Sequence, residues 1–190
     1  MSPPVDDTGA RPAPGDRQLL VIDTATTRAL VALGDPDGRL RAESSWVAGY
    51  RHGEELLPVV AALLDADGLV REDLGGLVVG TGPGAFTGLR VGIATVKALA
   101  HALRLPVAGV ATAEALLAAA RADGAGTPVL VQPAGPSDRV LTRPGAAPRI
   151  LPGGEEPDLV PGETLVAVDL DGRAPDDAVR RGEAAHRGLG

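Results

Sequence analysis

The 190-residue chain contains no cysteine, and aromatic residues make up only 2% of it. The absence of cysteine excludes disulfides, thiolate zinc sites and a cysteine nucleophile, and it suits a cytosolic protein. Because aromatic residues are scarce, the core must be built from Val, Leu, Ile and Ala. Trp46, Tyr50 and Phe86 are each the single residue of their type, so they mark local features.

Positive charge is also scarce, with 18 Lys and Arg against 25 Asp and Glu, a formal net charge of −7. Nucleic-acid affinity comes mainly from Lys and Arg that neutralise phosphates. We therefore expect no direct binding of RNA by this chain alone, and any contact with tRNA to be indirect.

Long apolar runs are missing as well. The most apolar stretch, 98–120, is interrupted by Arg104, Pro106 and Glu114, so no segment is expected to cross a bilayer. The first 17 residues lack the apolar core of a signal peptide. The expectation is a soluble, cytoplasmic protein with no membrane partner.

The pattern that is present predicts a mixed α/β first half. Apolar runs at residues 18–23, 29–35 and 39–46, separated by turn residues, indicate an antiparallel meander. The elements expected next are a helix at 54–65, a strand at 74–80, a helix at 86–103, a strand at 105–110 and a helix from Thr112. Strands that alternate with helices imply parallel pairing through crossovers, which makes the order β-β-β-α-β-α-β-α.

Two positions test the predicted helix ends. Pro58 is compatible with the first of these helices only if it falls within the first turn, because proline cannot donate an amide hydrogen bond. Thr112 is expected to cap the start of the third helix with its hydroxyl.

The character of the chain changes after Thr127. Seven prolines lie between Pro133 and Pro161, so strands are expected only at 129–132, 139–142 and 164–170, with a last short helix at 175–188. The predicted organisation is a disordered tail at 1–17, an N-terminal lobe at 18–127, and a reduced, partly irregular C-terminal lobe at 128–190.

A glycine-rich loop at 80–92 stands between a predicted strand and a predicted helix, which suits an anion site. Gly80, Gly82 and Ala85 match the G-x-G-x-x-A dinucleotide fingerprint, but no acidic residue ends the following strand. Pro83 also removes one amide donor. We therefore favour a conformational role for these glycines and assign no cofactor.

Other candidates for chemistry are weak. "DTATT", residues 23–27, could hold a metal and phosphates, although an ordinary turn with local side-chain hydrogen bonds is the preferred interpretation. No G-x-S-x-G elbow is present, and Ser44 and Ser45 have no assignable base. The three histidines, His52, His101 and His186, lack partners at ligand spacing. No catalytic residue and no metal site are assigned.

Two helices carry more apolar surface than one buried face needs. On the helix at 86–103, one row is apolar: Leu89, Ile93, Val96, Ala100 and Leu103. A second row is mostly small and would let another helix approach: Gly88, Gly92, Thr95, Leu99 and Ala102. The basic row of Arg90, Lys97, His101 and Arg104 is interpreted as a solvated face. Either a partner or complete burial within the fold would explain the surplus.

Four segments appear in an order and spacing that resemble the bacterial TsaB (YeaZ) family: "LLVIDTAT", "HGEELLP", "GLVVGTGPGAFTGLRVGIATVKALA" and "LPVAGVAT". The resemblance covers about residues 18–120. It implies the actin-like, sugar-kinase and Hsp70-like ATPase fold, with two lobes that each contain a mixed sheet with helices. The element order derived above is the one that the first lobe of this fold requires.

The resemblance also implies a function. TsaB is a degenerate paralogue of TsaD, the enzyme that transfers a threonylcarbamoyl group to N6 of the adenosine beside the anticodon. It binds and activates TsaD, with the ATPase TsaE joining the assembly. "ATAEAL" offers no histidine pair for a catalytic metal, and Ala25 and Thr26 stand where active relatives have a glycine. Both losses favour a non-catalytic subunit.

Family members pair through the first two helices of the first lobe, with TsaD or as homodimers. By position, the interface residues implied here are Leu56, Leu57, Val60, Leu64, Gly88, Gly92, Ile93 and Val96.

The second half departs from the family pattern, since Pro133 replaces an acid and a GDG-like turn survives only as "DLDG", residues 169–172. The chain also stops earlier than expected. Two alternatives remain open: an actin-like nucleotide hydrolase or peptidase, as the older label "glycoprotease" suggests, and a self-associating protein whose dimer is the functional form.

Overall fold

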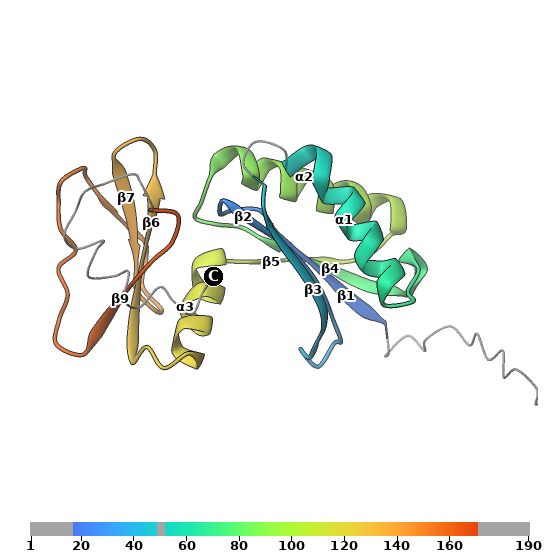
Figure 1. Ribbon diagram of the computed structural model, residues 1–190, viewed down its shortest axis with the longest axis horizontal. Helices are drawn as coiled ribbons and strands as arrows, with labels where there is room; N and C mark the ends of the chain where they lie inside the picture. Colours follow the sequence, from blue (N-terminus) through green and yellow to red (C-terminus); the bar gives the residue numbers. More distant parts are fainter. Residues whose placement is uncertain (1–16, 49–51, 171–190) are drawn as a thin grey trace, which may run out of the picture.

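The computed structural model describes residues 17–48 and 52–170, which form two β-sheets with helices around them (Figure 1). The predicted N-terminal tail up to residue 16, the predicted helix at 175–188 and the last two residues of "DLDG" lie outside the described residues.

The first sheet has five strands in the order β3-β2-β1-β4-β5. Their bounds are β1 Gln18–Asp23, β2 Arg28–Gly34, β3 Leu40–Val47, β4 Leu74–Gly80 and β5 Val107–Val110. β1, β2 and β3 pair antiparallel, whereas β4 pairs parallel with both β1 and β5. The predicted meander and its parallel continuation are confirmed.

Helices α1 (His52–Ala66) and α2 (Phe86–Leu103) lie side by side on one face of this sheet (Figure 1). A short 3-10 helix, Arg71–Asp73, leads into β4. Alternate strand residues point toward the helices and form the first core with the inward residues of α1 and α2. This core consists of Leu20, Ile22, Val31, Leu33, Leu56, Val60, Leu63, Leu64, Leu74, Leu77, Val79 and Val96.

Two expectations about helix ends are wrong. α1 begins at His52, so Pro58 lies beyond the first turn, inside the helix. Glu54, whose carbonyl would accept the missing proline hydrogen bond, and Pro58 are both exposed, so water can satisfy that carbonyl. Ala111, not Thr112, occupies the N-cap of α3, and its methyl side chain cannot accept a capping hydrogen bond; the Thr112 hydroxyl donates to Asp23 instead.

The second sheet has four strands in the order β8-β7-β6-β9. They are β6 Thr127–Ala134, β7 Asp138–Thr142, β8 Arg149–Leu151 and β9 Glu163–Ala167. β6 pairs antiparallel with β7 and parallel with β9, and β7 pairs antiparallel with β8. Three of these strands overlap the predicted ones, whereas β8 was not predicted.

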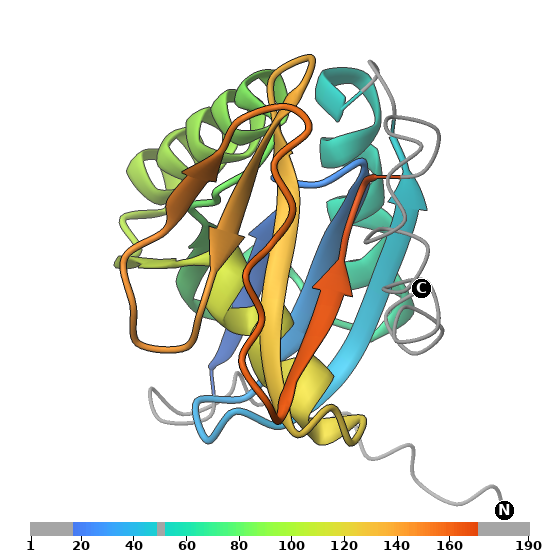
Figure 2. The ribbon, with the colours of Figure 1, turned by 90° about the vertical axis from the view of Figure 1, so that its left-hand side faces the viewer.

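Helix α3 (Thr112–Ala122) lies between the two sheets and packs on one face of the second (Figures 1 and 2). Its inward residues Ala113, Leu117 and Ala120 join Leu130 and Val166 in a buried cluster. α3 follows β5 of the first sheet and is joined to β6 of the second by a short link, so this helix is the main part of the connection between the two sheets.

The four strands of the second sheet repeat the order and directions of β3-β2-β1-β4. In the first sheet, α1 connects the third strand to the fourth. In the second sheet the same connection is residues 152–162, which contain no helix and which we call the strap. The strap runs over the face of the sheet turned away from α3 (Figure 2). That face carries a second core: Val129, Val131, Leu141, Leu151, Leu165, Ala167 and Leu170.

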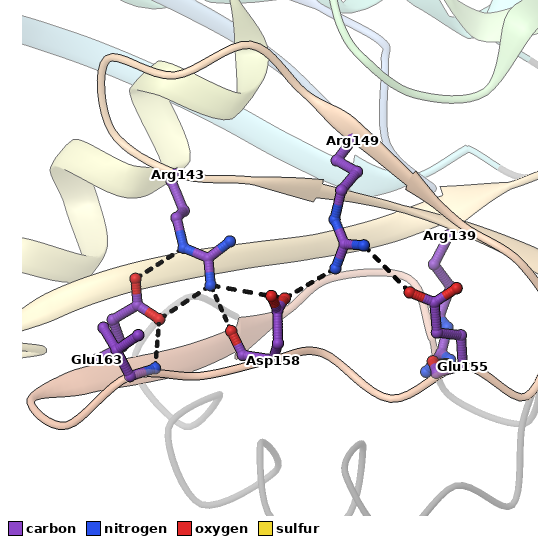
Figure 3. A network of polar contacts seen from close by, with 7 residues as sticks. Arg139, Arg143, Arg149, Glu155, Asp158 and Glu163 are labelled. Atoms are coloured by element: carbon purple, nitrogen blue, oxygen red, sulfur yellow. Dashed lines mark hydrogen bonds and ion pairs between the residues drawn. The ribbon is translucent and has the colours of Figure 1, made fainter.

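Charged side chains fasten the strap to the sheet (Figure 3). Arg143, just after β7, donates from Nη2 to the backbone carbonyl of Asp158 in the strap and from Nε to Oε1 of Glu163, the first residue of β9, over 2.7 Å. Arg149 of β8 reaches Asp158 over 2.8 Å and Glu155 over 3.1 Å. The buried Arg139 guanidinium donates to the backbone carbonyl of Glu155. The connection that lacks a helix is therefore tethered by ion pairs and charge-assisted hydrogen bonds.

Candidate functional site

The β1–β2 turn, residues 24–27, packs directly against the glycine loop and the start of α2. The Ala85 amide donates to the carbonyl of Ala25 over 2.7 Å, and the Thr24 hydroxyl donates to the carbonyl of Gly88 over 2.7 Å. A Cβ atom at Gly84 would overlap the Ala25 carbonyl, and one at Gly92 would overlap the Thr24 hydroxyl. These glycines are required by close approach of the chain's own turn.

Asp23, at the end of β1, ties three segments together. Its carboxylate accepts a hydrogen bond from the Ala25 amide over 2.8 Å, which is the local turn bond expected for this motif. It also accepts from the Thr112 hydroxyl over 2.8 Å, and that hydroxyl accepts from the Gly82 amide over 3.0 Å. Burial raises the pKa of the Asp23 carboxyl, and the two hydrogen bonds partly oppose this effect. The carboxylate at the end of β1 therefore holds the β1–β2 turn and the start of α3 together.

A cleft of about 810 Å³ opens between the two sheets. Its walls come from the β1–β2 turn, the glycine loop with the first residue of α2, the end of β6 with the β6–β7 turn, and the second residue after β9. They are Ala25, Thr27, Gly84, Ala85, Phe86, Gln132, Pro133, Ala134, Gly135, Pro136 and Asp169. Asp169 is the one ionisable residue among these, so the cleft is mainly apolar. Its size is typical of sites for small ligands.

Two polar contacts cross from one sheet to the other beside this cleft. Thr27 donates to the Asp169 carboxylate from its amide, over 2.7 Å, and from its hydroxyl. The side-chain amide of Gln132 donates to the carbonyl of Pro83 over 3.3 Å. The amide and hydroxyl donors of Thr27, in the turn beside the cleft, are therefore bound by a residue of the same chain.

The sequence analysis marked Phe86 as a local feature but did not predict its exposure or its contact with Arg90. Its ring is 72% exposed at the rim of the cleft, and the Arg90 guanidinium carbon lies 5.2 Å from the ring centroid. Such a geometry is a cation–π contact. The spacing of four residues on a helix was a usable signal, because residues i and i+4 are neighbours on a helix surface.

Among the described residues, no group of three or more His, Cys, Asp or Glu side chains gathers where a metal ion could bind. His101 is exposed on α2, and His186 lies outside the described part. Ser45 accepts a hydrogen bond from Arg28 over 3.3 Å rather than facing a base. Within the same residues, no helix is long and apolar enough to cross a membrane.

The eight residues predicted for a partner interface occupy different environments. Leu56, Val60, Leu64 and Val96 are buried in the first core. Ile93 is half-buried against that core, and Gly88 and Gly92 are buried near the β1–β2 turn. Leu57 is 50% exposed on the outer side of α1. The interface stays a prediction, and on the isolated chain Leu57 is its accessible member.

Charge divides the outer surface of α1 and α2, which we call the helical face. On α1 the exposed charges are Glu54 and Asp65, whereas on α2 they are Arg90 and Lys97, with His101 beside them. α1 has no Lys or Arg, and α2 has no Asp or Glu. The sequence analysis missed this contrast because it judged the basic row alone; comparing the two helices would have found it.

The chain matches a family model described as TsaD, tRNA N6-adenosine threonylcarbamoyltransferase, over residues 46–168. That match covers more than half of the chain, from the end of β3 through β9, and so includes β4, β5, the three helices and the whole second sheet.

Individual relatives agree with the family match. The tRNA threonylcarbamoyladenosine biosynthesis protein TsaB of Escherichia coli is 39% identical over 95 residues, which are 50% of this chain and 40% of that protein. A Mycobacterium leprae protein is 47% identical over 102 residues, covering 52% of this chain and 28% of its own length. The matched segment thus spans less than half of these curated relatives.

A solved structure extends the similarity to most of the fold. YeaZ from Pseudomonas aeruginosa superposes with a TM-score of 0.61 at 33% identity, covering 72% of this chain and 67% of that one. The α/β class, the mixed sheets and the order of elements in the first lobe expected for the actin-like fold are confirmed.

Proposed function

Because this chain belongs to the TsaD family, among its TsaB (YeaZ) members, we propose that it is a non-catalytic subunit in tRNA threonylcarbamoyladenosine biosynthesis. In this proposal it binds a TsaD-type paralogue and activates the transfer of the threonylcarbamoyl group to the adenosine beside the anticodon. A TsaE-type ATPase joins the assembly, and tRNA is contacted through the paralogue.

The observation that carries the proposal is the helical face. An acidic helix and a basic helix lie side by side, with Leu57 exposed between the charges of α1. If a paralogue carries the same two helices, one orientation places its basic helix against the acidic α1 and its acidic helix against the basic α2. Other orientations bring like charges together, so one register of the interface is favoured. Under twofold symmetry the face also complements itself, so the chain alone forms a homodimer by the same contacts.

The hydrogen bonds at the β1–β2 turn support the proposal that this subunit is non-catalytic. The Asp23 carboxylate is held by the Ala25 amide and the Thr112 hydroxyl, and the Thr27 donors bind Asp169. Groups that are engaged within the fold are not free to activate water or hold a transferred group. We place the partner interface on the lobe at 18–127 and assign the lobe at 128–190 a supporting role.

Reconstitution tests the function as a whole. This chain is mixed with its TsaD-type and TsaE-type partners, tRNA and threonylcarbamoyl-adenylate, and modified adenosine is quantified by mass spectrometry. The proposal expects product only when this chain is present. Equal product in its absence would rule out an activating role.

The interface is tested with two exposed leucines. Leu57→Asp places a charge on the helical face, whereas Leu40→Asp places one on β3, where Leu40 is 62% exposed. Both variants should fold, because neither residue is buried. We expect Leu57→Asp to weaken binding of the TsaD-type partner by about tenfold or more, measured by titration calorimetry, because a desolvated charge at an interface is unfavourable. Unchanged affinity for Leu57→Asp would move the interface elsewhere.

A further inference from the structure

The first sheet has a second face, opposite α1 and α2. Strand residues alternate between the two faces and paired neighbours point the same way, so the register places Val21, Ala32 and Val78 together on this side. The apolar side chains of this side, which we call the open face, are Leu19, Val21, Leu30, Val78, Ala108 and Val110. The four leucine and valine side chains of β1, β2 and β4 are half-buried, and the two residues of β5 are exposed.

The described helices leave the centre of the open face uncovered. α1 and α2 lie on the other face of the sheet (Figure 1). α3 meets the open face at its edge, where the Thr112 hydroxyl binds Asp23, while its inward residues pack on the second sheet. None of the three buried clusters formed by the described residues contains a side chain of the open face. An apolar sheet face of this extent calls for a cover.

The path of the chain brings its last segment to this place. The Asp169 carboxylate is bound by Thr27, three residues before Leu30 of the open face. The described chain ends at Leu170, and four residues separate Leu170 from the segment 175–188, for which the sequence predicts a helix. Four extended residues span about 14 Å. The segment 175–188 therefore begins within reach of the edge of the open face.

The sequence of 175–188 has the two sides that such a cover needs. At helical spacing one side is small and uncharged: Ala178, Gly182 and Ala185. The opposite side is charged: Asp176, Arg180, Glu183 and Arg187. On a helix, each acid of this set lies one turn before a base, a favourable arrangement on an exposed surface. The pattern predicts a helix with one side against the protein and one side in water.

Helix α3 shows how such a small side packs on a sheet. Its inward residues Ala113, Leu117 and Ala120 repeat at spacing four and three, and they bury Leu130 and Val166 of the second sheet. Ala178, Gly182 and Ala185 have the same spacing. A helix of 14 residues is about 21 Å long, close to the roughly 20 Å of a six-residue strand such as β1. The segment thus matches the open face in length as well as in character.

We propose that residues 175–188 form a helix that packs on the open face of the same molecule through Ala178, Gly182 and Ala185. Each sheet is then covered by a helix that follows the other sheet in sequence, α3 on the second and 175–188 on the first. The cover removes the apolar side chains of the open face from water, which stabilises the docked state. It leaves the helical face accessible. This inference does not depend on the proposed partner.

The test uses the absence of cysteine from the chain. Arg180→Cys creates a single site for a nitroxide spin label, on the charged side of the segment and so outside the proposed contact. Methyl resonances of the full chain are recorded with the nitroxide oxidised and then reduced. We expect the oxidised label to broaden the methyl signals of Val21, Leu30 and Val78 strongly, and that of Leu57 on the helical face much less, because α1 lies beyond the sheet.

Two neighbouring alanines provide a matched pair of variants in the labelled protein. Ala185→Asp places a charge on the side proposed to face the sheet, whereas Ala184→Asp places the same charge toward the charged side. Burial of an unpaired charge is unfavourable, so Ala185→Asp should reduce the broadening at Val21 and Val78 to the level seen at Leu57. Ala184→Asp should leave the broadening unchanged.

Three results would overturn the proposal. The first is equal, weak broadening on both faces of the sheet in the labelled protein. The second is the same effect of Ala184→Asp and Ala185→Asp. The third is broadening of the open face that arises between molecules, detected by mixing spin-labelled protein with separately methyl-labelled protein that carries no nitroxide. That result would show that a second copy, and not the chain's own segment, covers the open face.

Discussion

The two sheets of this protein share a strand order and differ in what covers them. In the first sheet, β3 connects to β4 through α1, and the aliphatic side chains of α1 and α2 complete a dry core. In the second sheet, the corresponding connection is the strap, whose Glu155 and Asp158 are bound by Arg139, Arg143 and Arg149. The same topology is thus completed once by apolar packing and once by charge.

This difference has an energetic meaning. Salt does not screen the burial of apolar side chains, and a cavity in such a core is costly because neighbours relax only partly. Ion pairs near the surface contribute less individually and are screened by salt. The first sheet should therefore be sensitive to the size of its covering side chains, and the second to ionic conditions.

The largest loss of stability is expected from a substitution in α1, which covers the first sheet. Leu56→Ala removes a side chain that is 1% exposed, whereas Leu159→Ala shortens a strap residue that is 43% exposed. We expect Leu56→Ala to lower the free energy of unfolding by about 2–5 kcal/mol and Leu159→Ala by about 0.5 kcal/mol or less. Urea denaturation followed by circular dichroism measures both. Similar losses in the two variants would contradict the contrast between the covers.

A smaller effect is expected at the strap. Arg143→Ala removes the contacts with Asp158 of the strap and the pair with Glu163 of β9, whose side chain is 8% exposed, and should cost about 1–2 kcal/mol at low salt. The loss should shrink in concentrated salt as screening weakens the pair in wild type. The control is Arg71→Ala, which removes the exposed pair with Glu72 and should change little. A loss at Arg143 that does not vary with salt would mean that packing rather than charge holds the strap.

The smallest expected effect concerns how stability depends on pH: Asp23 of the first sheet and Glu163 of the second should contribute with opposite signs. Burial raises the pKa of Asp23 above 3.8, so the folded state binds this proton more tightly, and stability from this group falls as pH rises through the interval above 3.8. Hydrogen bonds from Arg143 and Val160 lower the pKa of Glu163 below 4.5, so its contribution is present above pH 4.5 and is lost as pH falls through the lowered value.

Two substitutions separate these signs. Asp23→Asn should remove the decline with rising pH, and Glu163→Gln should remove the loss with falling pH, when unfolding free energies are measured between about pH 3 and 7. Asparagine keeps an acceptor for Thr112, and glutamine keeps one for Arg143. For each variant, the difference in unfolding free energy from wild type is plotted against pH. Slopes of the same sign for both variants would contradict opposite pKa shifts of the two carboxyls.

The first sheet could be predicted because its signals are local. Runs of alternating and continuous apolar residues marked β1, β2 and β4, and a long periodic segment marked α2. β8 could not be predicted in the same way, since Arg149–Leu151 is a three-residue strand enclosed by prolines and is defined by its pairing with β7.

The site was harder to predict because its contacts join distant segments. The N-cap rule assigned the Thr112 hydroxyl to its own helix, but Asp23, far away in sequence, takes it instead. Nothing near Asp169 signals its contact with Thr27. Leu56, Val60 and Val96 were predicted as interface residues and lie in the first core of this chain; the sequence pattern could not distinguish burial in this fold from burial against a partner.

The strap also has a consequence for how the chain reaches its final structure. A helix such as α1 forms hydrogen bonds within itself and shortens the distance between the strands it joins. The strap offers no such local gain, so the pairing of Thr127 with Glu163 must meet the full entropy of closing the intervening loop. Pairing between distant segments is slow for this reason. We therefore expect the first sheet to assemble early and β9 to be the last strand added.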